Sequence, residues 1–265
     1  MTPPVVLTVG ASDSLGGNGI QGDLRTLAAL RVYGASAVTS VLARNTRGTA
    51  DLYPVPANVV ATQVGTVLDD LPVSAVKTGT FATADACAAV TARARAGDLP
   101  NLVVDPVLTA TEGARKGLTA ALERLLPYAL IATPDREEAS ELLGWQVASP
   151  ADMAGAASQL AAGGPRYVVV TGGDLVVGNE AVDAMWLEGS VRMLRSPRLA
   201  SRNRYGTGSA FATAIAGRLA LGDSPGDAVA RAKDFVSRAI TGAAGWTLGR
   251  GGGPIDHFGW STPGR

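Results

Sequence analysis

The segment Asn203 to Ala210 has the composition of an anion-binding loop. It contains Gly206-Thr207-Gly208 followed by Ser209, and an apolar stretch rich in alanine comes next. Glycines at the start of a helix leave backbone N–H groups free beside the positive end of the helix dipole, so an anion can bind there. A tight turn capped by a serine or threonine hydroxyl would explain the same residues without a ligand. The segment by itself leaves both interpretations open.

A pair of acidic residues, Asp135 and Glu138, forms a second group that could do chemistry. They follow Thr133-Pro134 at the predicted start of a helix, and their spacing of three places them on one face. Such a pair could hold Mg²⁺ through water beside nucleotide phosphates. It could also do no more than complement the helix dipole. Taken alone, the pair does not decide between a metal site and a helix start.

The composition excludes several other chemistries. Among 265 residues there is one cysteine, Cys87, and one histidine, His257, so the composition argues against a cysteine or histidine metal cluster, a disulfide framework and a Cys–His dyad. The 23 basic and 23 acidic residues balance, and aromatic residues make up 5%, so no basic stacking surface for nucleic acid is expected. No apolar run approaches the roughly 18 to 20 residues of a membrane helix, and residues 1–6 lack the charged start of a signal peptide. We therefore expect a cytoplasmic protein that binds neither nucleic acid nor a membrane.

The glycine-rich segment and the acidic pair must be positioned by secondary-structure elements, and strands and helices are predicted to alternate along the chain. Short β-branched runs alternate with longer amphipathic segments, which predicts one α/β domain over residues 1–265, with a mostly parallel central sheet covered by helices on both faces. Ligands bind at the carboxyl ends of the strands in such sheets, so we expect one cleft along that edge. The predicted strands are Val5–Val9, Ala37–Leu42, Ala75–Thr78, Leu102–Asp105, Leu130–Thr133 and Tyr167–Thr171, with a hairpin over residues 181–197. The predicted helices cover residues 19–31, 57–71, 83–97, 117–126, 136–143, 151–163, 207–221 and 225–243.

Several motifs, in order along nearly the whole chain, resemble the hydroxymethylpyrimidine and phosphomethylpyrimidine kinases of the ribokinase-like superfamily. These enzymes are close relatives of one class of pyridoxal kinases. The matching segments are Val9–Ser14, Gly16–Leu24, Asn45–Gly48, Val76–Gly79, Val104–Val107, Thr133–Pro134 with Glu138–Ala139, Gly206–Gly208 and Gly253–Phe258. Together these motifs are far more specific than any one of them.

The resemblance implies ATP-dependent phosphorylation of hydroxymethylpyrimidine or its phosphate, in a ribokinase-like fold that is often dimeric. By position, the catalytic anion hole would be Gly206, Thr207, Gly208 and Ser209. The nucleotide would be bound by Asp105, Thr133, Asp135, Thr171 and Gly173, and magnesium by Asp135 and Glu138. The small-molecule substrate would contact Ala11, Asp23, Arg44, Thr80 and Val107. A pyridoxal-type kinase and a ligand-binding homologue without useful kinase activity are the alternatives.

The chain departs from this family at the catalytic position. Ser209 stands where the pyrimidine kinases usually have cysteine. An isolated serine hydroxyl cannot take a proton near neutral pH, and the loss of a base costs roughly 10²–10⁴-fold in rate. A phosphate acceptor is already anionic and needs no base. We therefore predict that Ser209 favours phosphorylation of the monophosphate over that of the alcohol.

Other departures concern the two ligands. Arg44 replaces a common glutamine and Thr80 a common methionine. Arginine only donates hydrogen bonds, so it fits a carbonyl, carboxylate or phosphate better than an exocyclic amine, unless its side chain faces solvent. Asp135 replaces asparagine and Thr171 replaces lysine, which makes the nucleotide site more negative. Low ATP affinity is expected unless Arg202 or Arg204 compensates.

Overall fold

A computed structural model describes residues 2–108, 112–173 and 175–261 and contains one nine-stranded sheet. Its strands are β1 (Val5–Asp13), β2 (Tyr33–Asn45), β3 (Gly48–Pro54), β4 (Val73–Thr78), β5 (Val103–Val104), β6 (Ile131–Ala132), β7 (Tyr167–Val170), β8 (Glu180–Leu187) and β9 (Ser190–Pro197). Their spatial order is β3-β2-β1-β4-β5-β6-β7-β8-β9. The strands from β2 to β7 in this order pair in parallel, and β3, β8 and β9 are antiparallel additions at the two ends. The predicted mostly parallel α/β sheet is confirmed.

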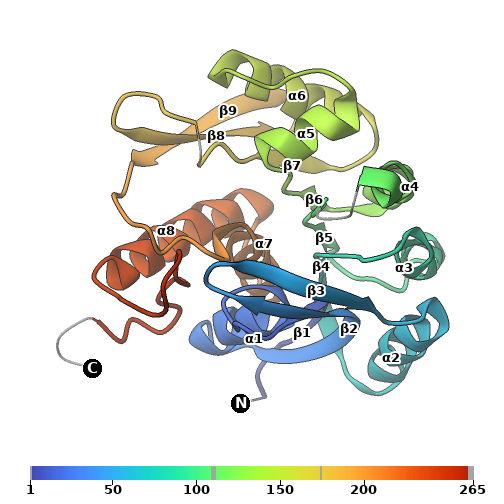
Figure 1. Ribbon diagram of the computed structural model, residues 1–265. Coiled ribbons are helices and arrows are strands. Elements are labelled where there is room, and N and C mark those ends of the chain that lie inside the picture. Colours follow the sequence, from blue (N-terminus) through green and yellow to red (C-terminus); the bar gives the residue numbers. More distant parts are fainter. Residues whose placement is uncertain (1, 109–111, 174, 262–265) are drawn as a thin grey trace.

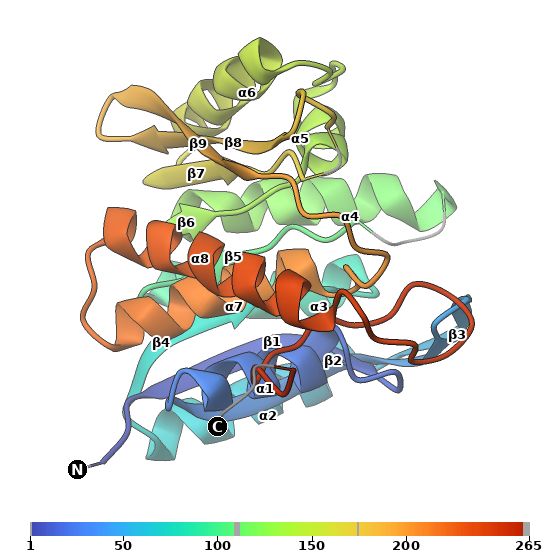
Figure 2. The same ribbon diagram turned by 90° about the vertical axis from the view of Figure 1, so that its left-hand side faces the viewer.

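Helices cover both faces of the sheet. Figure 1 shows α1, α7 and α8 on one side and α2, α3 and α4 on the other, and in Figure 2 α7 and α8 lie in front of the sheet. Alternate β1 side chains enter the two cores, because Leu7 and Val9 face one cluster of buried apolar residues and Val6 faces the other. The helices are α1 (Gly19–Ala29), α2 (Ala57–Asp70), α3 (Ala84–Ala96), α4 (Glu112–Leu125), α5 (Arg136–Leu143), α6 (Pro150–Ala162), α7 (Thr207–Ala220) and α8 (Pro225–Ala243), with a short 3₁₀ turn at Leu126–Tyr128.

The largest difference from the predicted elements is the hairpin of β2 and β3. Strand β3, with the sequence GTADLYP, lies at the edge of the sheet and is mostly exposed, so no apolar alternation marks it. Helix α4 begins at Glu112, earlier than the predicted residue 117. The predicted hairpin over residues 181–197 is present as β8 and β9, and its turn residues Glu188 and Gly189 have φ values of 49° and 88°, as a type I′ turn requires.

None of the helices in the described ranges is both long and apolar enough to cross a membrane.

The carboxyl ends of the parallel strands lie along one edge of the sheet. Gly79 follows β4, Asp105 follows β5, Thr133 follows β6 and Thr171 follows β7. An isolated β-bridge joins Asp135 to Thr171, which brings the start of α5 to the end of β7. This edge therefore gathers the polar residues that the sequence places after each strand.

Candidate active site

The start of α7 is an uncapped helix end at the sheet edge. Its N-cap residue is Gly206, with φ 88° and no side-chain hydrogen bond to the first turn. A Cβ atom at Gly206 would overlap the carbonyl oxygen of Gly17, and the positive φ also disfavours any side chain, so both requirements select glycine. The sequence also allowed a tight turn capped by a serine or threonine hydroxyl, but no such side-chain cap is present at this helix start, which lies among the described residues. The amides of Gly208 and Ser209 lie in a helix start whose dipole favours an anion.

A pocket of about 380 Å³ opens beside this helix start. It brings Asp135, Thr171 and Gly173, all predicted to bind nucleotide, together with Thr207 and Gly208 of the predicted anion hole. The sequence reasoning did not assign the side of the pocket formed by β8, β9 and α8. The lining residues on that side are Ala181, Asp183, Ser196, Lys233, Val236, Ser237 and Ile240. Phe211 of α7 and Arg204, which the sequence analysis named as a possible compensating cation, complete the lining.

Two cationic side chains line this pocket. Lys233 Nζ lies 2.6 Å from Asp183 Oδ2, so its charge is neutralised by a buried carboxylate. The Arg204 guanidinium donates to the carbonyl oxygens of Leu199 at 2.6 Å and Gly173 at 3.3 Å. Burial, and then the nearby Arg198, lower the pKa of Arg204 from its usual value. Arg204 therefore lies where a cation could meet nucleotide phosphates.

An acidic group extends from this pocket towards β5. Asp135 Oδ1 accepts from the backbone N–H of Glu138 at 2.8 Å, and Glu138 Oε2 accepts from that of Asp135 at 2.8 Å, a reciprocal cap of α5. The pKa of Asp105 is raised to about 6 by burial, and further by the charges of Asp23 and Asp135. Burial, Asp105 and Asp135 raise the pKa of Glu138 well above its usual range. A nearby cation would offset the repulsion between these carboxylates and favour their ionised forms.

These residues meet part of what a magnesium ion requires. Within the described ranges, no three acidic, histidine or cysteine side chains converge on one metal position. Mg²⁺ commonly uses one or two carboxylates and completes its shell with water and substrate phosphates. The buried Asp105 Oδ2 has no hydrogen-bond partner among the described residues, although Lys77 Nζ lies 3.7 Å away as an ion-pair partner. Asp105, Asp135 and Glu138 are thus compatible with a magnesium held mainly by phosphates.

A buried polar cluster lies directly beneath the start of α7. Lys77 Nζ donates to Ser209 Oγ at 2.7 Å and lies 3.1 Å from Asp23 Oδ2. Thr213 donates to Asp23 Oδ1 at 2.7 Å, and Thr8 donates to Asp23 Oδ2. Sequence reasoning did not assign a role to Lys77, although a lysine inside the apolar run Ala75–Thr78 was a visible signal.

The residues predicted to contact the substrate fall into two groups. Ala11, Asp23 and Thr80 are buried, and Asp23 has no exposed surface because its carboxylate is surrounded by protein donors.

Arg44 is half-buried, with its guanidinium 4.4 Å from the centre of the Tyr205 ring, and it donates to Thr49 Oγ1 at 2.9 Å. It therefore does not extend into solvent. Val107 follows Asp105, whose carbonyl accepts from its N–H at 2.9 Å. Their contacts with a substrate stay predictions.

The family model of phosphomethylpyrimidine kinase matches residues 13–256. The chain belongs to this family. A hydroxymethylpyrimidine/phosphomethylpyrimidine kinase of Streptomyces coelicolor is 43% identical over 265 residues, which cover 98% of this chain and 96% of the relative. Among solved structures, an ADP complex of Bacillus subtilis pyridoxal kinase has a TM-score of 0.90 at 32% identity and covers 97% of this chain and 98% of that one. Staphylococcus aureus pyridoxal kinase in complex with AMP-PCP and pyridoxal has a TM-score of 0.90 at 31% identity, covering 99% and 96%.

Membership of the phosphomethylpyrimidine kinase family confirms the predicted class of small-molecule kinase and the ribokinase-like fold. The solved relatives bind ADP or AMP-PCP, which agrees with a nucleotide as one ligand of this fold. The family relationship does not test the effect of Ser209, Arg44, Asp135 or Thr171. The roles of these four positions stay predictions.

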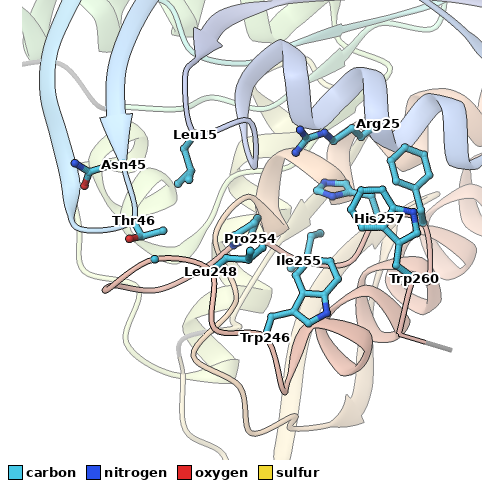
Figure 3. Close-up of a pocket in the computed structure, with 12 residues that line it drawn as sticks. Leu15, Arg25, Asn45, Thr46, Trp246, Leu248, Pro254, Ile255, His257 and Trp260 are labelled. Atoms are coloured by element: carbon cyan, nitrogen blue, oxygen red, sulfur yellow. The ribbon is translucent and has the colours of Figure 1, made fainter.

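This member of the phosphomethylpyrimidine kinase family has a second pocket, of about 460 Å³, near its C-terminal segment. Figure 3 shows Arg25 of α1, Asn45 and Thr46 of the β2–β3 turn, and Trp246 and His257 around it. Burial, and then the charge of Arg25, lower the pKa of His257 to about 4, so the imidazole is neutral at pH 7. Its lining includes none of the residues predicted to bind nucleotide or substrate.

Proposed function

We propose that this protein transfers a phosphoryl group from Mg-ATP to hydroxymethylpyrimidine phosphate and, more slowly, to hydroxymethylpyrimidine. The observation that carries the proposal is the uncapped start of α7 at Gly206, which opens onto the pocket containing Asp135, Thr171 and Gly173. Phosphoryl transfer depends mainly on positioning and on stabilising charge on the transferred group. Free amides at a helix start supply that stabilisation.

The nucleotide would occupy the pocket between β7, β8, α7 and α8. Its phosphates would point towards Gly208 and Ser209, where the helix dipole offsets their charge. Asp105, Asp135 and Glu138 would hold magnesium together with these phosphates, and Thr133, at the end of β6, would lie beside them. The bound ion would neutralise phosphate charge during transfer. The bound magnesium would also offset the negative charge of Asp135.

The acceptor would lie on the other side of the anion hole, next to the carboxyl-terminal parts of β1 and β2 and the residues after β4. Gly10 and Thr80 are close there, because a Cβ atom on Gly10 would lie 3.9 Å from the Thr80 nitrogen. Arg44 would add hydrogen-bond donors from the hairpin of β2 and β3. A phosphate on the acceptor would satisfy those donors. This requirement, together with the poor basicity of serine, supports the monophosphate as preferred acceptor.

A pyridoxal-type kinase is the second candidate. The observation in its favour is the similarity to pyridoxal kinases, with TM-scores of 0.90. We further infer a homodimer located in the cytoplasm; the family resemblance supports both inferences.

The direct test measures ADP formation from Mg-ATP by the native protein and by Ser209→Cys, with hydroxymethylpyrimidine, its phosphate and pyridoxal in parallel. The native protein should turn over the phosphate fastest. Ser209→Cys should accelerate the alcohol by at least tenfold and leave the phosphate rate almost unchanged, since a thiolate can accept the alcohol proton.

Three results would contradict parts of this proposal. Faster native turnover of the free alcohol would remove the proposed preference for the phosphate. Fastest turnover of pyridoxal would favour the second candidate. No binding of Mg-ATP at millimolar concentration in a calorimetric titration would favour a ligand-binding homologue without kinase activity.

A further inference from the structure

The cluster beneath Ser209 contains three buried charged groups. Asp23 of α1 has 0% of its surface exposed, Lys77 of β4 has 1%, and Asp105 after β5 has 5%. Lys77 Nζ lies 3.1 Å from Asp23 Oδ2 and 3.7 Å from Asp105 Oδ2. Two carboxylates and one ammonium leave this cluster one negative charge in excess when all three are ionised.

The hydrogen bonds around Ser209 give its hydroxyl a fixed direction. Lys77 Nζ can only donate, and it donates to Ser209 Oγ at 2.7 Å. Ser209 Oγ in turn donates its single proton to Asp23 Oδ1 at 2.8 Å. A hydroxyl oxygen has two lone pairs, of which Lys77 uses one. The second lone pair remains to accept a hydrogen bond from another group at the start of α7.

The position of Ser209 makes the acceptor's hydroxyl the natural donor to that lone pair. Ser209 is in the first turn of α7, directly after Thr207 and Gly208, which line the proposed nucleotide pocket. Ser209 itself is 8% exposed, directly follows the pocket residue Gly208 and donates to the buried carboxylate of Asp23. Its hydroxyl therefore connects the start of α7 to Asp23.

We propose that Ser209 relays the proton of an alcohol acceptor to Asp23, and that Lys77 is a positioning residue that sets the direction of the relay. This inference rests on the proposed kinase function. As the acceptor oxygen forms its bond to the γ-phosphorus and the bond from that phosphorus to ADP breaks, the acceptor's O–H proton moves to Ser209 Oγ. The original Ser209 proton moves to Asp23 Oδ1. Asp23 becomes neutral and ADP carries the electrons of the broken bond. When the products leave, the proton passes back through Ser209 to solvent, which restores the ionised Asp23.

The relay explains how a serine can occupy a position that calls for a base. The serine needs no unusual acidity, because the group that finally holds the proton is a carboxylate 2.8 Å away. Thr213, which donates to Asp23 Oδ1 at 2.7 Å, can keep its hydrogen bond after that oxygen is protonated. A phosphate acceptor attacks with an oxygen that is already charged. The relay therefore matters for the alcohol and hardly at all for the monophosphate.

The experiment combines Asp23→Asn with Ser209→Cys in a double-mutant cycle and measures single-turnover rates with both acceptors. Asp23→Asn preserves size and removes the proton acceptor. In the native background it should lower the rate with the alcohol by roughly 10²-fold or more, the usual contribution of a base. The same change should lower the rate with the phosphate only a few-fold. In the Ser209→Cys background, the loss of rate that Asp23→Asn causes with the alcohol should be at least tenfold smaller, because a thiolate accepts the proton itself.

Thr213→Val is the matched control. It removes a different hydrogen bond to the same carboxylate oxygen and leaves Ser209 in place, so its loss on the alcohol should be much smaller than that of Asp23→Asn. Calorimetric titration with Mg-ATP establishes that each variant is folded. Should Asp23→Asn fail to fold, the native protein provides the test through its solvent isotope effect in the single-turnover phase. The relay predicts a normal isotope effect with the alcohol and none with the phosphate.

The outcomes separate the relay from the proposed function. Equal losses on both acceptors, or equal losses in the serine and cysteine backgrounds, would overturn the relay and leave the kinase assignment standing. Equal isotope effects with both acceptors would do the same. No turnover of any acceptor by the native protein would overturn both.

Discussion

At the scale of single residues, Arg44 has the clearest consequence for specificity. Its guanidinium lies over Tyr205, whose hydroxyl donates to Asp13 Oδ2 at 2.9 Å, so the arginine is held by a ring that is itself fixed. Its buried Nε has no hydrogen-bond partner among the described residues. A buried donor without a partner costs free energy that a ligand acceptor would recover. Arg44 therefore favours a ligand with an anionic or carbonyl oxygen.

Arg44→Gln should shift the choice of acceptor. Glutamine can accept from the exocyclic amine of the pyrimidine but cannot pair with phosphate as a charged partner. We expect KM to fall for hydroxymethylpyrimidine and to rise about tenfold for its phosphate, since a hydrogen bond to a charged group is worth about 1.5–3 kcal/mol. Steady-state kinetics with both acceptors measure the change. Arg47→Gln, at an exposed position in the same hairpin, is the control, and an equal response from it would argue against the assignment.

At the scale of elements, the connection from β9 to α7 brings a positive charge to the pocket, which the end of β7 does not supply. Thr171 offers no charge to the pocket, while Arg204 reaches it from the segment just before Gly206. Arg204 is tied to the carbonyls of Gly173 and Leu199, so it links this segment to the turn after β7. The low ATP affinity expected from Thr171 and Asp135 should thus be partly offset. Arg202, the other candidate, is exposed and is not part of the pocket lining.

Arg204→Gln should weaken Mg-ATP binding about tenfold, which corresponds to about 1.4 kcal/mol. Adding Thr171→Lys to this variant should restore much of the affinity, because it returns a positive charge to the same pocket. Calorimetric titration with Mg-ATP gives both values, with Arg202→Gln as the exposed control. If Arg204 only held the segment in place through its carbonyl contacts, the lysine would not rescue binding.

At the scale of the whole molecule, two buried titratable groups make opposite contributions to stability. The pKa of Asp105 is raised to about 6, so between pH 4 and pH 6 the folded state binds more protons than the unfolded state, and this group's contribution falls as the pH rises. The pKa of His257 is lowered to about 4, so between pH 4 and pH 6.5 the unfolded state binds more protons. The contribution of His257 therefore falls as the pH decreases.

The two contributions can be separated with single substitutions. Relative to the native protein, Asp105→Asn should gain stability as the pH rises from 4 to 6, and His257→Gln should gain stability as the pH falls from 6.5 to 4. Each relative change should amount to about 1.4 kcal/mol per unit of pKa shift. Urea unfolding of the nucleotide-free proteins across this range measures the differences. Parallel pH profiles for the three proteins would contradict both assignments.

The sequence by itself determined the layered architecture and the family. Apolar β-branched runs such as Val5–Val9 and Tyr167–Thr171 encode buried strands, because only such runs can be covered on both faces. Gly206 and the residues around it were identifiable because a free helix start needs glycine and small residues. Strand β3 could not be found in this way, because an exposed edge strand carries no alternating pattern.

Only the tertiary structure decided which groups meet. Asp23, Lys77 and Ser209 are far apart in the chain and come from α1, β4 and α7, so no local pattern could reveal their shared hydrogen bonds. The structure likewise placed Arg204, rather than Arg202, in the proposed nucleotide pocket and turned Arg44 onto Tyr205. The physical reason is that periodicity encodes burial, which is a property of each element. The hydrogen bonds of a site depend instead on how separate elements pack against one another.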